Sequence, residues 1–216
     1  MWRNSSPECS DKLKSGSKYL LLSFLVIVLD QATKMLVHFN MEYGLQGQIL
    51  LLGDWLKLHY TLNPGMAFGM QLGGDNGKLL LTSFRIVAIG GLVFYLFHLL
   101  RTKAHKAYIT CIALITGGAA GNLIDSVFYG VLLGNAPEGS PSPWMHGQVV
   151  DMIYVDIWEG FLPDWLPVLG GQYYALWPIF NVADATIFCS IIALMIFGNK
   201  WTAPESTETA SPEEKG

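Results

Sequence analysis

The sequence predicts an all-α polytopic membrane protein with four transmembrane helices and a small extracytoplasmic β-sheet. Its 216 residues are 51% hydrophobic and only 14% charged, and the mean hydropathy is +0.36. These values are unusual for a soluble domain of this length. Four segments reach the roughly 20 apolar residues that cross a bilayer core of about 30 Å. Too little polar chain remains to enclose four buried core helices, so we expect all four to span the membrane.

The four expected helices cover about residues 19–39, 79–100, 107–132 and 177–197. The first runs on without the small-residue exit site of a cleaved signal sequence, so we expect it to be retained. Lys and Arg in short flanks mark the cytoplasmic side. They gather before the first helix, between the second and third, and after the fourth: Lys12, Lys14, Lys18, Arg101, Lys103, Lys106 and Lys200. Both termini are therefore expected in the cytoplasm.

The outer loops, residues 40–78 and 133–176, are expected to form more than connections. Apolar and polar residues alternate over 56–62, which is typical of a half-buried strand, and Asn-Pro-Gly at 63–65 then turns the chain. Residues 148–158 predict a second strand. Together the strands indicate a small outer sheet whose edges could pair with an extended peptide.

The domain organisation follows from the same pattern. Residues 1–198 are interpreted as a single membrane domain. Residues 199–216 are interpreted as a disordered cytoplasmic tail, because they are polar and lack periodicity.

Three acids lie within the expected spans: Asp30, Asp125 and Asp184. A charged side chain at the centre of a span costs about 2.5 to 3.5 kcal/mol on insertion scales and is by default a functional hypothesis. At about 1.5 Å per residue, all three fall in the outer half, with Asp184 about two turns inside the fourth helix. Asp151 should lie just above them on the second strand. We therefore expect one shared polar site.

Each acid also has a structural interpretation. Asp30 and Lys34 are four residues apart on one helical face, where an ion pair would make insertion tolerable. Asp125 follows Asn122 by three residues, so a structural hydrogen-bonded pair is as compatible with the pattern as catalysis.

The other two acids are judged differently. Asp184 also follows an Asn by three residues, but it has no basic neighbour within a turn, which favours a function. Asp151 alone resembles other loop acids, and the residues themselves do not separate it from Asp125.

Several chemistries are disfavoured by composition. The net charge of −4 and the lack of a basic stripe argue against nucleic acid. Three distant cysteines do not indicate a disulfide framework, and five dispersed histidines do not indicate a metal site. No cofactor is expected. Carboxylates that share one proton, and so act as acid and base, remain the favoured chemistry.

Five motifs carry a family resemblance: DQATK (30–34), NPGMAFG (63–69), GGAAGNLID (117–125), VVDMIYV (149–155) and FNVADATI (180–187). In this order they resemble the signature blocks of the bacterial lipoprotein signal peptidase family, also called signal peptidase II. The resemblance spans about residues 18–197.

The resemblance implies an intramembrane aspartic endopeptidase. Such an enzyme removes the signal peptide from diacylglyceryl-modified prolipoproteins by cutting just before the lipidated cysteine. It would be a multi-pass protein of the bacterial inner membrane with its active site at the outer face. The implied fold has four spans and an outer β-cradle. Signal peptides and membrane lipid would be its partners, and the expected state is a monomer.

The resemblance also assigns residues. It implies that Asp151 and Asp184 are the catalytic pair. Six further positions would orient this pair and hold the substrate backbone: Asp30, Lys34, Asn63, Asn122, Asp125 and Asn181.

The chain departs from the family pattern at two places. Ser126 stands where an Arg is common, so the cationic contact usually supplied there is either missing or comes from elsewhere, with Arg85 and Lys34 as the candidates. The stretch 131–146 is longer than usual, and we expect a flexible insertion that leaves the catalytic pair intact. A proton-coupled carrier and a non-enzymatic assembly factor are the rival interpretations. The carrier predicts acids spread across the membrane depth and repeated discontinuous spans, which the sequence does not show. The assembly factor would not need Asp151 to lie near Asp184.

Overall fold

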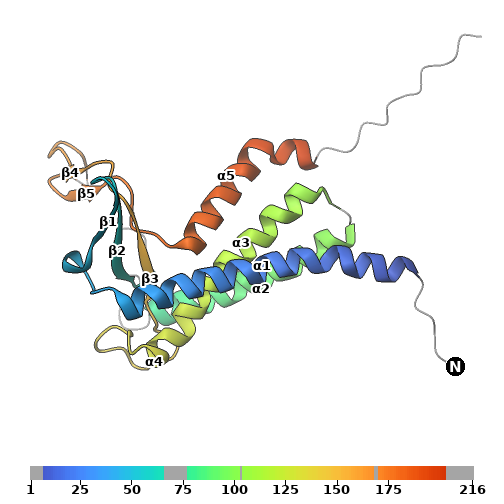
Figure 1. Cartoon of the computed structure of the whole chain (residues 1–216), viewed down its shortest axis with the longest axis horizontal. Helices are drawn as coiled ribbons and strands as arrows, with labels where there is room; N and C mark the ends of the chain where they lie inside the picture. Colours follow the sequence, from blue (N-terminus) through green and yellow to red (C-terminus); the bar gives the residue numbers. More distant parts are fainter. Residues whose placement is uncertain (1–6, 66–76, 103, 168–169, 203–216) are drawn as a thin grey trace, which may run out of the picture.

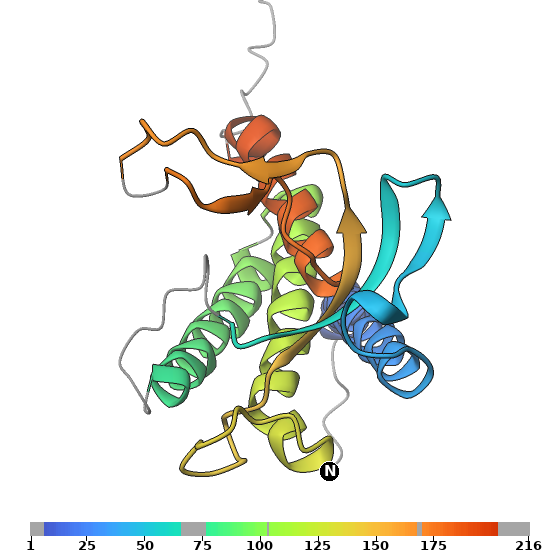
Figure 2. The same ribbon diagram turned by 90° about the vertical axis from the view of Figure 1, so that its left-hand side faces the viewer.

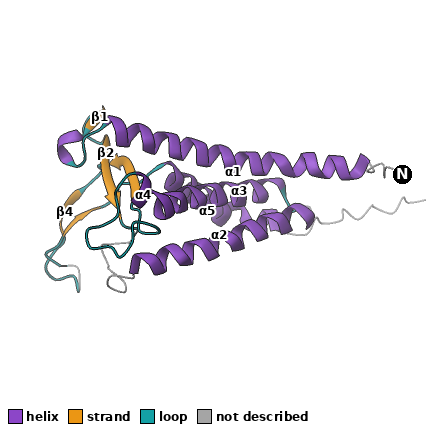
Figure 3. Cartoon of the chain, turned by 90° about the horizontal axis from the view of Figure 1, so that it is seen from below, coloured by secondary structure: helices purple, strands orange, loops and turns teal. Residues whose placement is uncertain are grey.

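The computed structural model describes residues 7–65, 77–102, 104–167 and 170–202. Positions 66–69 of the second motif, Lys103 and the tail from residue 203 therefore lie outside the described residues. The described part contains a bundle of long helices with strands gathered at one end (Figures 1 and 3). The first and last described residues lie toward the opposite end of the bundle from the strands (Figure 1).

The long helices are α1 (Pro7–Asn40), α2 (Gly77–Thr102), α3 (Lys106–Ile124) and α5 (Val182–Thr202). A π-helical turn, η4 (Asp125–Tyr129), and the short α4 (Gly130–Leu132) continue α3 to its end. Among the described residues, four helices are long and apolar enough to cross a membrane, as the sequence predicts. Large apolar side chains remain exposed along their outer faces, where lipid would cover them.

The fourth span begins at Val182 rather than at about residue 177. Pro178 has no backbone N–H and disfavours helix at the residue before it. Phe180 instead forms an isolated antiparallel bridge with Ile153, and α5 begins after Asn181. Asp184 therefore lies in the first turn of α5, not two turns inside as expected.

Helix α3 lies at the centre and packs against α1, α2 and α5. Small residues on its surface permit the close approach. A Cβ on Gly117 would lie 2.7 Å from the carbonyl oxygen of Ser23 on α1, and one on Gly118 would lie 2.7 Å from that of Ala183 on α5. The glycines of the third motif thus serve helix packing, as their apolar setting indicates.

The sheet at the end of the bundle contains β1 (Ile49–Leu52), β2 (Leu56–Asn63) and β3 (Val149–Val155), all antiparallel in that order (Figure 2). The strands β2 and β3 match the predicted ones, although β3 ends three residues earlier than expected. β1 is not predicted, because its continuous apolar run has no alternation. A short helical turn, η1 (Leu45–Gly47), leads into it.

A second antiparallel pair, β4 (Glu159–Phe161) and β5 (Tyr173–Ala175), lies beyond β3. Three residues in each strand are too few for a periodic signal, and the sequence did not predict this pair.

The sheet is attached to the bundle by an apolar cluster. Val37 of α1, Tyr60 of β2, Tyr129 of η4, and Val150 and Met152 of β3 are all buried there. This cluster holds β3 against the C-terminal end of α1 and the π-helical turn that follows α3, and so fixes the position of Asp151 relative to the helices.

The loop between α4 and β3 is closed by hydrogen bonds. Three hydrogen bonds join Asn135 and Gln148. Asn135 Nδ2 donates to Gln148 O at 3.0 Å, Gln148 N donates to Asn135 Oδ1 at 3.1 Å, and Gln148 Nε2 donates to Asn135 O at 2.9 Å. Its last residues return to the bundle, where Met145 N donates to Val127 O at 3.1 Å. The flexibility expected of this insertion stays a prediction.

Candidate active site

Asp151 is presented by the middle of β3 and is 1% exposed. Its Oδ2 accepts a hydrogen bond of 2.9 Å from Asn63 Nδ2, at the end of the neighbouring strand. Its Oδ1 accepts one of 2.7 Å from Asn181 Nδ2. Asn63 is itself held by the turn that follows, because its Oδ1 accepts from Gly65 N at 2.7 Å. The turn needs glycine there, since Gly65 has a φ of +84°.

Asp184 belongs to the cap of α5. Asn181 precedes the helix, and its Oδ1 accepts from the backbone N of Asp184 at 2.9 Å. In return Asp184 Oδ2 accepts from the backbone N of Asn181 at 3.4 Å. This reciprocal arrangement is a capping box with Asp at its third helical position. The positive end of the helix dipole favours negative charge at this place.

Two amide side chains connect these carboxylates. Asn181 Nδ2 donates both to Asp151 Oδ1 and, at 3.1 Å, to Asn122 Oδ1. Asn122 Nδ2 in turn donates to Asp184 Oδ1 at 2.8 Å. The structure therefore brings Asp151 and Asp184, which are 33 positions apart in the chain, into one hydrogen-bonded group.

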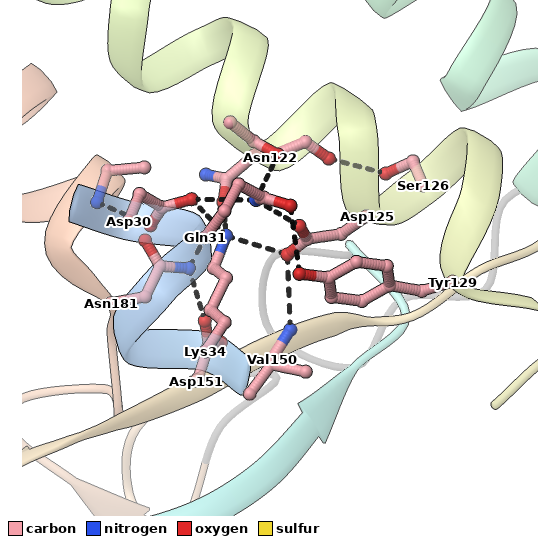
Figure 4. Close-up of polar contacts among 12 residues, drawn as sticks. Asp30, Gln31, Lys34, Asn122, Asp125, Ser126, Tyr129, Val150, Asp151 and Asn181 are labelled. Atoms are coloured by element: carbon pink, nitrogen blue, oxygen red, sulfur yellow. Dashed lines mark hydrogen bonds and ion pairs between the residues drawn. The ribbon is translucent and has the colours of Figure 1, made fainter. Parts of the chain in front are cut away.

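Lys34 is the centre of the buried cluster beside this group (Figure 4). Its ammonium lies 2.8 Å from Asp30 Oδ2, 2.6 Å from Asp125 Oδ2 and 2.8 Å from Asn122 Oδ1. All three of its N–H donors are thus engaged, and all three charged side chains are fully buried. The predicted pair of Asp30 and Lys34 is present, with Asp125 as a second anion.

Asp30 also connects two helices. Its Oδ1 accepts a hydrogen bond of 3.0 Å from the backbone N of Ala183, in the first turn of α5. A Cβ on Gly121 of α3 would lie 2.6 Å from Asp30 Oδ2, so only glycine fits beside this carboxylate. Asp30 therefore fixes the start of α5 against α1 and α3.

Asp125 is bound by residues that the sequence analysis did not single out. Its Oδ1 accepts from Gln31 Nε2 at 2.8 Å, and its Oδ2 from the backbone N of Val150 at 3.4 Å. Tyr129 holds Gln31 by donating from its hydroxyl to Oε1 at 2.9 Å. Gln31 could have been found as the uncharged polar residue next to Asp30. Both Asp125 and Tyr129 are buried in the π-helical turn, and the α-helical hydrophobic period of the sequence does not predict such a turn.

Asn122 does not serve Asp125 as the sequence pattern suggested. Its described side-chain bonds go to Lys34, Asn181 and Asp184. The same three-residue spacing at 181 and 184 does give a bonded pair, through the capping box.

Ser126 has a cationic partner from another helix. Arg85 of α2 donates from Nη1 to Ser126 Oγ at 2.7 Å, and Ser126 donates to the carbonyl oxygen of Asn122 at 2.9 Å. Of the two candidates, Arg85 contacts Ser126, while the donors of Lys34 are used elsewhere. That Arg85 replaces the family's cationic contact stays a prediction.

The environment of Asp151 favours its protonated form. Burial is the largest cause and the charge of Asp184 adds to it, raising the pKa of Asp151 to about 7. Hydrogen bonds from Asn63 and Asn181 oppose this shift but do not cancel it. Near neutral pH Asp151 can therefore hold a proton and release it. Within the described ranges, no three His, Cys, Asp or Glu side chains are grouped so as to hold a metal ion.

Comparisons with known proteins agree with the resemblance. The family model described as signal peptidase (SPase) II matches residues 22–199. The lipoprotein signal peptidase of Amoebophilus asiaticus is 48% identical over 83% of this chain and 76% of its own length. That of Porphyromonas gingivalis is 37% identical over 94% of this chain and 97% of its own.

Two solved structures of bacterial membrane enzymes share the fold. One has a TM-score of 0.54 at 24% identity and covers 83% of this chain and 91% of its own. The other has a TM-score of 0.56 at 22% identity, with coverages of 90% and 95%. At these identities the likeness concerns the fold alone.

Proposed function

This chain belongs to the signal peptidase II family of aspartic peptidases, and we propose that Asp151 and Asp184 are the aspartates with which it cleaves lipoprotein signal peptides. The observation that carries the proposal is their link through Asn181, whose side chain bonds Asp151 and caps the helix turn that holds Asp184. Strand β3 and the first turn of α5 thus each contribute one carboxyl group to the same hydrogen-bonded site.

The two carboxyls differ in a way that suits acid and base roles. Asp151 is buried and its raised pKa favours the protonated acid, whereas Asp184 is only partly buried at the positive end of α5. We assign Asp151 as the general acid and Asp184 as the general base.

The assigned roles balance over one cycle. Asp184 takes a proton from water as the water oxygen bonds to the scissile carbonyl carbon, while Asp151 gives its proton to the carbonyl oxygen. When the C–N bond breaks, Asp184 passes its proton to the leaving nitrogen and Asp151 recovers one from the hydroxyl. Both groups end as they began.

Six residues would support this pair: Asp30, Lys34, Asn63, Asn122, Asp125 and Asn181. Asn63 and Asn181 fix the two oxygens of Asp151, and Asn122 fixes one of Asp184. The ion cluster around Lys34 ties α1 to α3 beneath them. Their expected work is orientation, together with holding the extended backbone of the substrate.

The substrate is expected to be a lipid-modified prolipoprotein, cut just before the lipidated cysteine. Its lipid chains would stay in the bilayer while the outer sheet holds the cleavage segment extended. Such a pose requires the sheet at the outer face of the bacterial inner membrane and both termini in the cytoplasm. The exposed basic residues Arg101, Lys106 and Lys200 at the opposite helix ends support this orientation. The enzyme is expected to act as a monomer without a cofactor.

The test is cleavage of a diacylglyceryl-modified prolipoprotein by the purified enzyme, followed as a loss of size on a gel. Asp151→Asn and Asp184→Asn should each lower turnover by about 10³-fold or more while leaving the fold intact. Asp156→Asn is the matched control, because this acid follows the same strand but pairs with Lys57 at the surface. Turnover by either Asn variant near the parent rate would remove that residue from the pair.

A further inference from the structure

Helix α2 carries a polar stripe that the proposed catalytic pair does not account for. Lys78, Thr82 and Arg85 are spaced by four and three residues, so they share one face in the first half of a largely apolar helix. Each contacts a different outer segment. Lys78 Nζ donates to Pro64 O at 2.7 Å, Thr82 Oγ1 lies 2.8 Å from Met145 O, and Arg85 bonds Ser126.

The guanidinium of Arg85 lies between the two segments that support the carboxylates. On one side Nη1 is 2.7 Å from Ser126 Oγ, next to Asp125 in the π-helical turn. On the other side, a Cβ on Gly65 would lie 2.8 Å from Nη2, so the guanidinium fills the space beside the turn after β2. That turn is the one that holds Asn63, a partner of Asp151.

Several charged groups interact electrostatically with this guanidinium. Asp184 of α5, Asp125 of η4 and Asp151 of β3 all lie within its electrostatic range. The other cations are Lys78 on its own helix and Lys34 of α1. Lys34 is already paired with both Asp30 and Asp125, and its charge also opposes the raised pKa of Asp151.

Arg85 differs from Lys34 in two respects. A guanidinium stays charged at every pH at which the protein is folded. Among the ion pairs that the described residues form, none involves Arg85, so its charge acts on the acids at a distance.

We propose that Arg85 is a positioning residue whose guanidinium, anchored on Ser126, keeps one of Asp151 and Asp184 ionised while the other holds the shared proton. The inference rests on the proposed function, since it concerns that same pair. Without a nearby positive charge, removal from water shifts a carboxyl toward its neutral form, so less of the base is ionised at a given pH.

Loss of the Arg85 charge should shift the pH dependence of kcat in one direction, and misfolding would not produce such a shift. Removing a positive charge raises the pKa of a nearby carboxyl, so ionising the base then requires a higher pH. Arg85→Gln keeps a donor for Ser126 but has no charge. In a plot of kcat against pH, the acid-side limb is the part in which kcat rises as the base ionises. In Arg85→Gln this limb should move to higher pH, and kcat at pH 6 should fall by about tenfold or more. Arg85→Lys retains the charge, and its limb should stay near that of the parent.

The direct contact between residues 85 and 126 permits a swap. In the double variant Arg85→Ser with Ser126→Arg, the guanidinium would return to the same space from the opposite wall. This variant should recover most of the kcat lost in Arg85→Ser and the parent pH limb. Arg101→Gln is the matched control, since it removes an exposed arginine from the far end of the same helix.

These measurements separate this inference from the proposed function. A shifted limb in Arg85→Gln with recovery in the swap supports the inference. An unshifted limb overturns it, whether activity is kept or merely lowered, and so does a folded swap variant that behaves like Arg85→Ser. Should Arg85→Gln fail to fold, the other two variants decide. A limb near that of the parent in Arg85→Lys together with recovery in the swap supports the inference, and a displaced limb in Arg85→Lys or a folded swap variant without recovery overturns it. Failure of the proposed function would be seen elsewhere, as activity retained by Asp151→Asn or Asp184→Asn.

Discussion

Asn181 shows how much one side chain contributes to this site. It caps α5, donates to Asp151 and bonds Asn122, which holds Asp184. From the residues alone, its spacing to Asp184 is readable but its contact with Asp151 is not. That contact depends on the bridge between Phe180 and Ile153, which joins segments far apart in sequence. For the same reason residue patterns could not rank Asp151 above Asp125, and the family resemblance had to do so.

The raised pKa of Asp151 makes a prediction about pH and activity. As general acid Asp151 must be protonated, so kcat/KM should fall as pH rises above about 7, where this group loses its proton. The measurement is kcat/KM between pH 5 and 9 on a lipidated peptide substrate. A constant kcat/KM up to pH 9 would contradict the assignment of Asp151 as the acid.

The same shift predicts how stability depends on pH. Because the pKa of Asp151 is higher in the folded state than its ordinary 3.8, its favourable contribution is complete below that value and is lost as pH rises through about 7. Asp151→Asn lacks this titration. The Tm of the parent should therefore fall by several degrees relative to Asp151→Asn between pH 5 and 8, measured in one detergent. Parallel Tm curves would show that the group is not shifted.

Two ion pairs of different burial give a matched comparison. Lys34→Met leaves Asp30 and Asp125 buried without their cation and should cost about 3 to 5 kcal/mol of unfolding free energy. Lys57→Met removes the partner of Asp156 near the surface, where both side chains keep 15 to 18% exposure, and should cost much less. Denaturation of both variants in the same detergent checks the difference, and equal losses would be inconsistent with it.

At the scale of elements, the helices and strands that could be predicted are those with a clear hydrophobic pattern in the sequence. The long apolar helices and the alternating strand β2 could be predicted from pattern, whereas β1, β4 and β5 have continuous or very short apolar runs. The π-helical turn η4 was hidden, because one extra residue per turn leaves no mark in composition. The start of α5 was misjudged because Trp177 and Phe180 are apolar but not helical, and Pro178 was the signal that limits the helix.

The glycine face of α3 leads to a prediction about two elements together. In Gly118→Ala the new methyl group would lie 2.7 Å from Ala183 O, so α5 must shift and carry Asp184 with it. We expect both a lower Tm and a loss of kcat of about tenfold or more. Gly90→Ala on α2 is the control, because its Cβ meets nothing within 4 Å, and should leave both unchanged. A fully active Gly118→Ala variant would show that this contact does not position α5.

At the scale of the whole molecule, the strands and the described chain ends lie at opposite ends of the bundle (Figure 1). Pattern predicted this arrangement, because the number of spans is even and the outer loops carry the strand signals. Composition could not predict how the outer loop returns to the bundle. That path is set by local hydrogen bonds such as those of Asn135.

The proposed orientation can be tested with single cysteines, introduced after the native Cys9, Cys111 and Cys189 have been replaced by serine. Glu138→Cys lies in the outer loop and Lys106→Cys at the other end, and both native side chains are exposed. In spheroplasts, a membrane-impermeant maleimide should label Glu138→Cys and reach Lys106→Cys only after lysis. The reverse pattern would place the sheet in the cytoplasm and end the proposed substrate pose.

The capping box of α5 has one more consequence. The bonds that begin this helix are also the bonds that hold the proposed reacting carboxylate, so the helix cannot fray at its first turn while the site stays assembled. A tight inhibitor should therefore slow amide hydrogen exchange in residues 182–185, far more than in the last turn of the same helix.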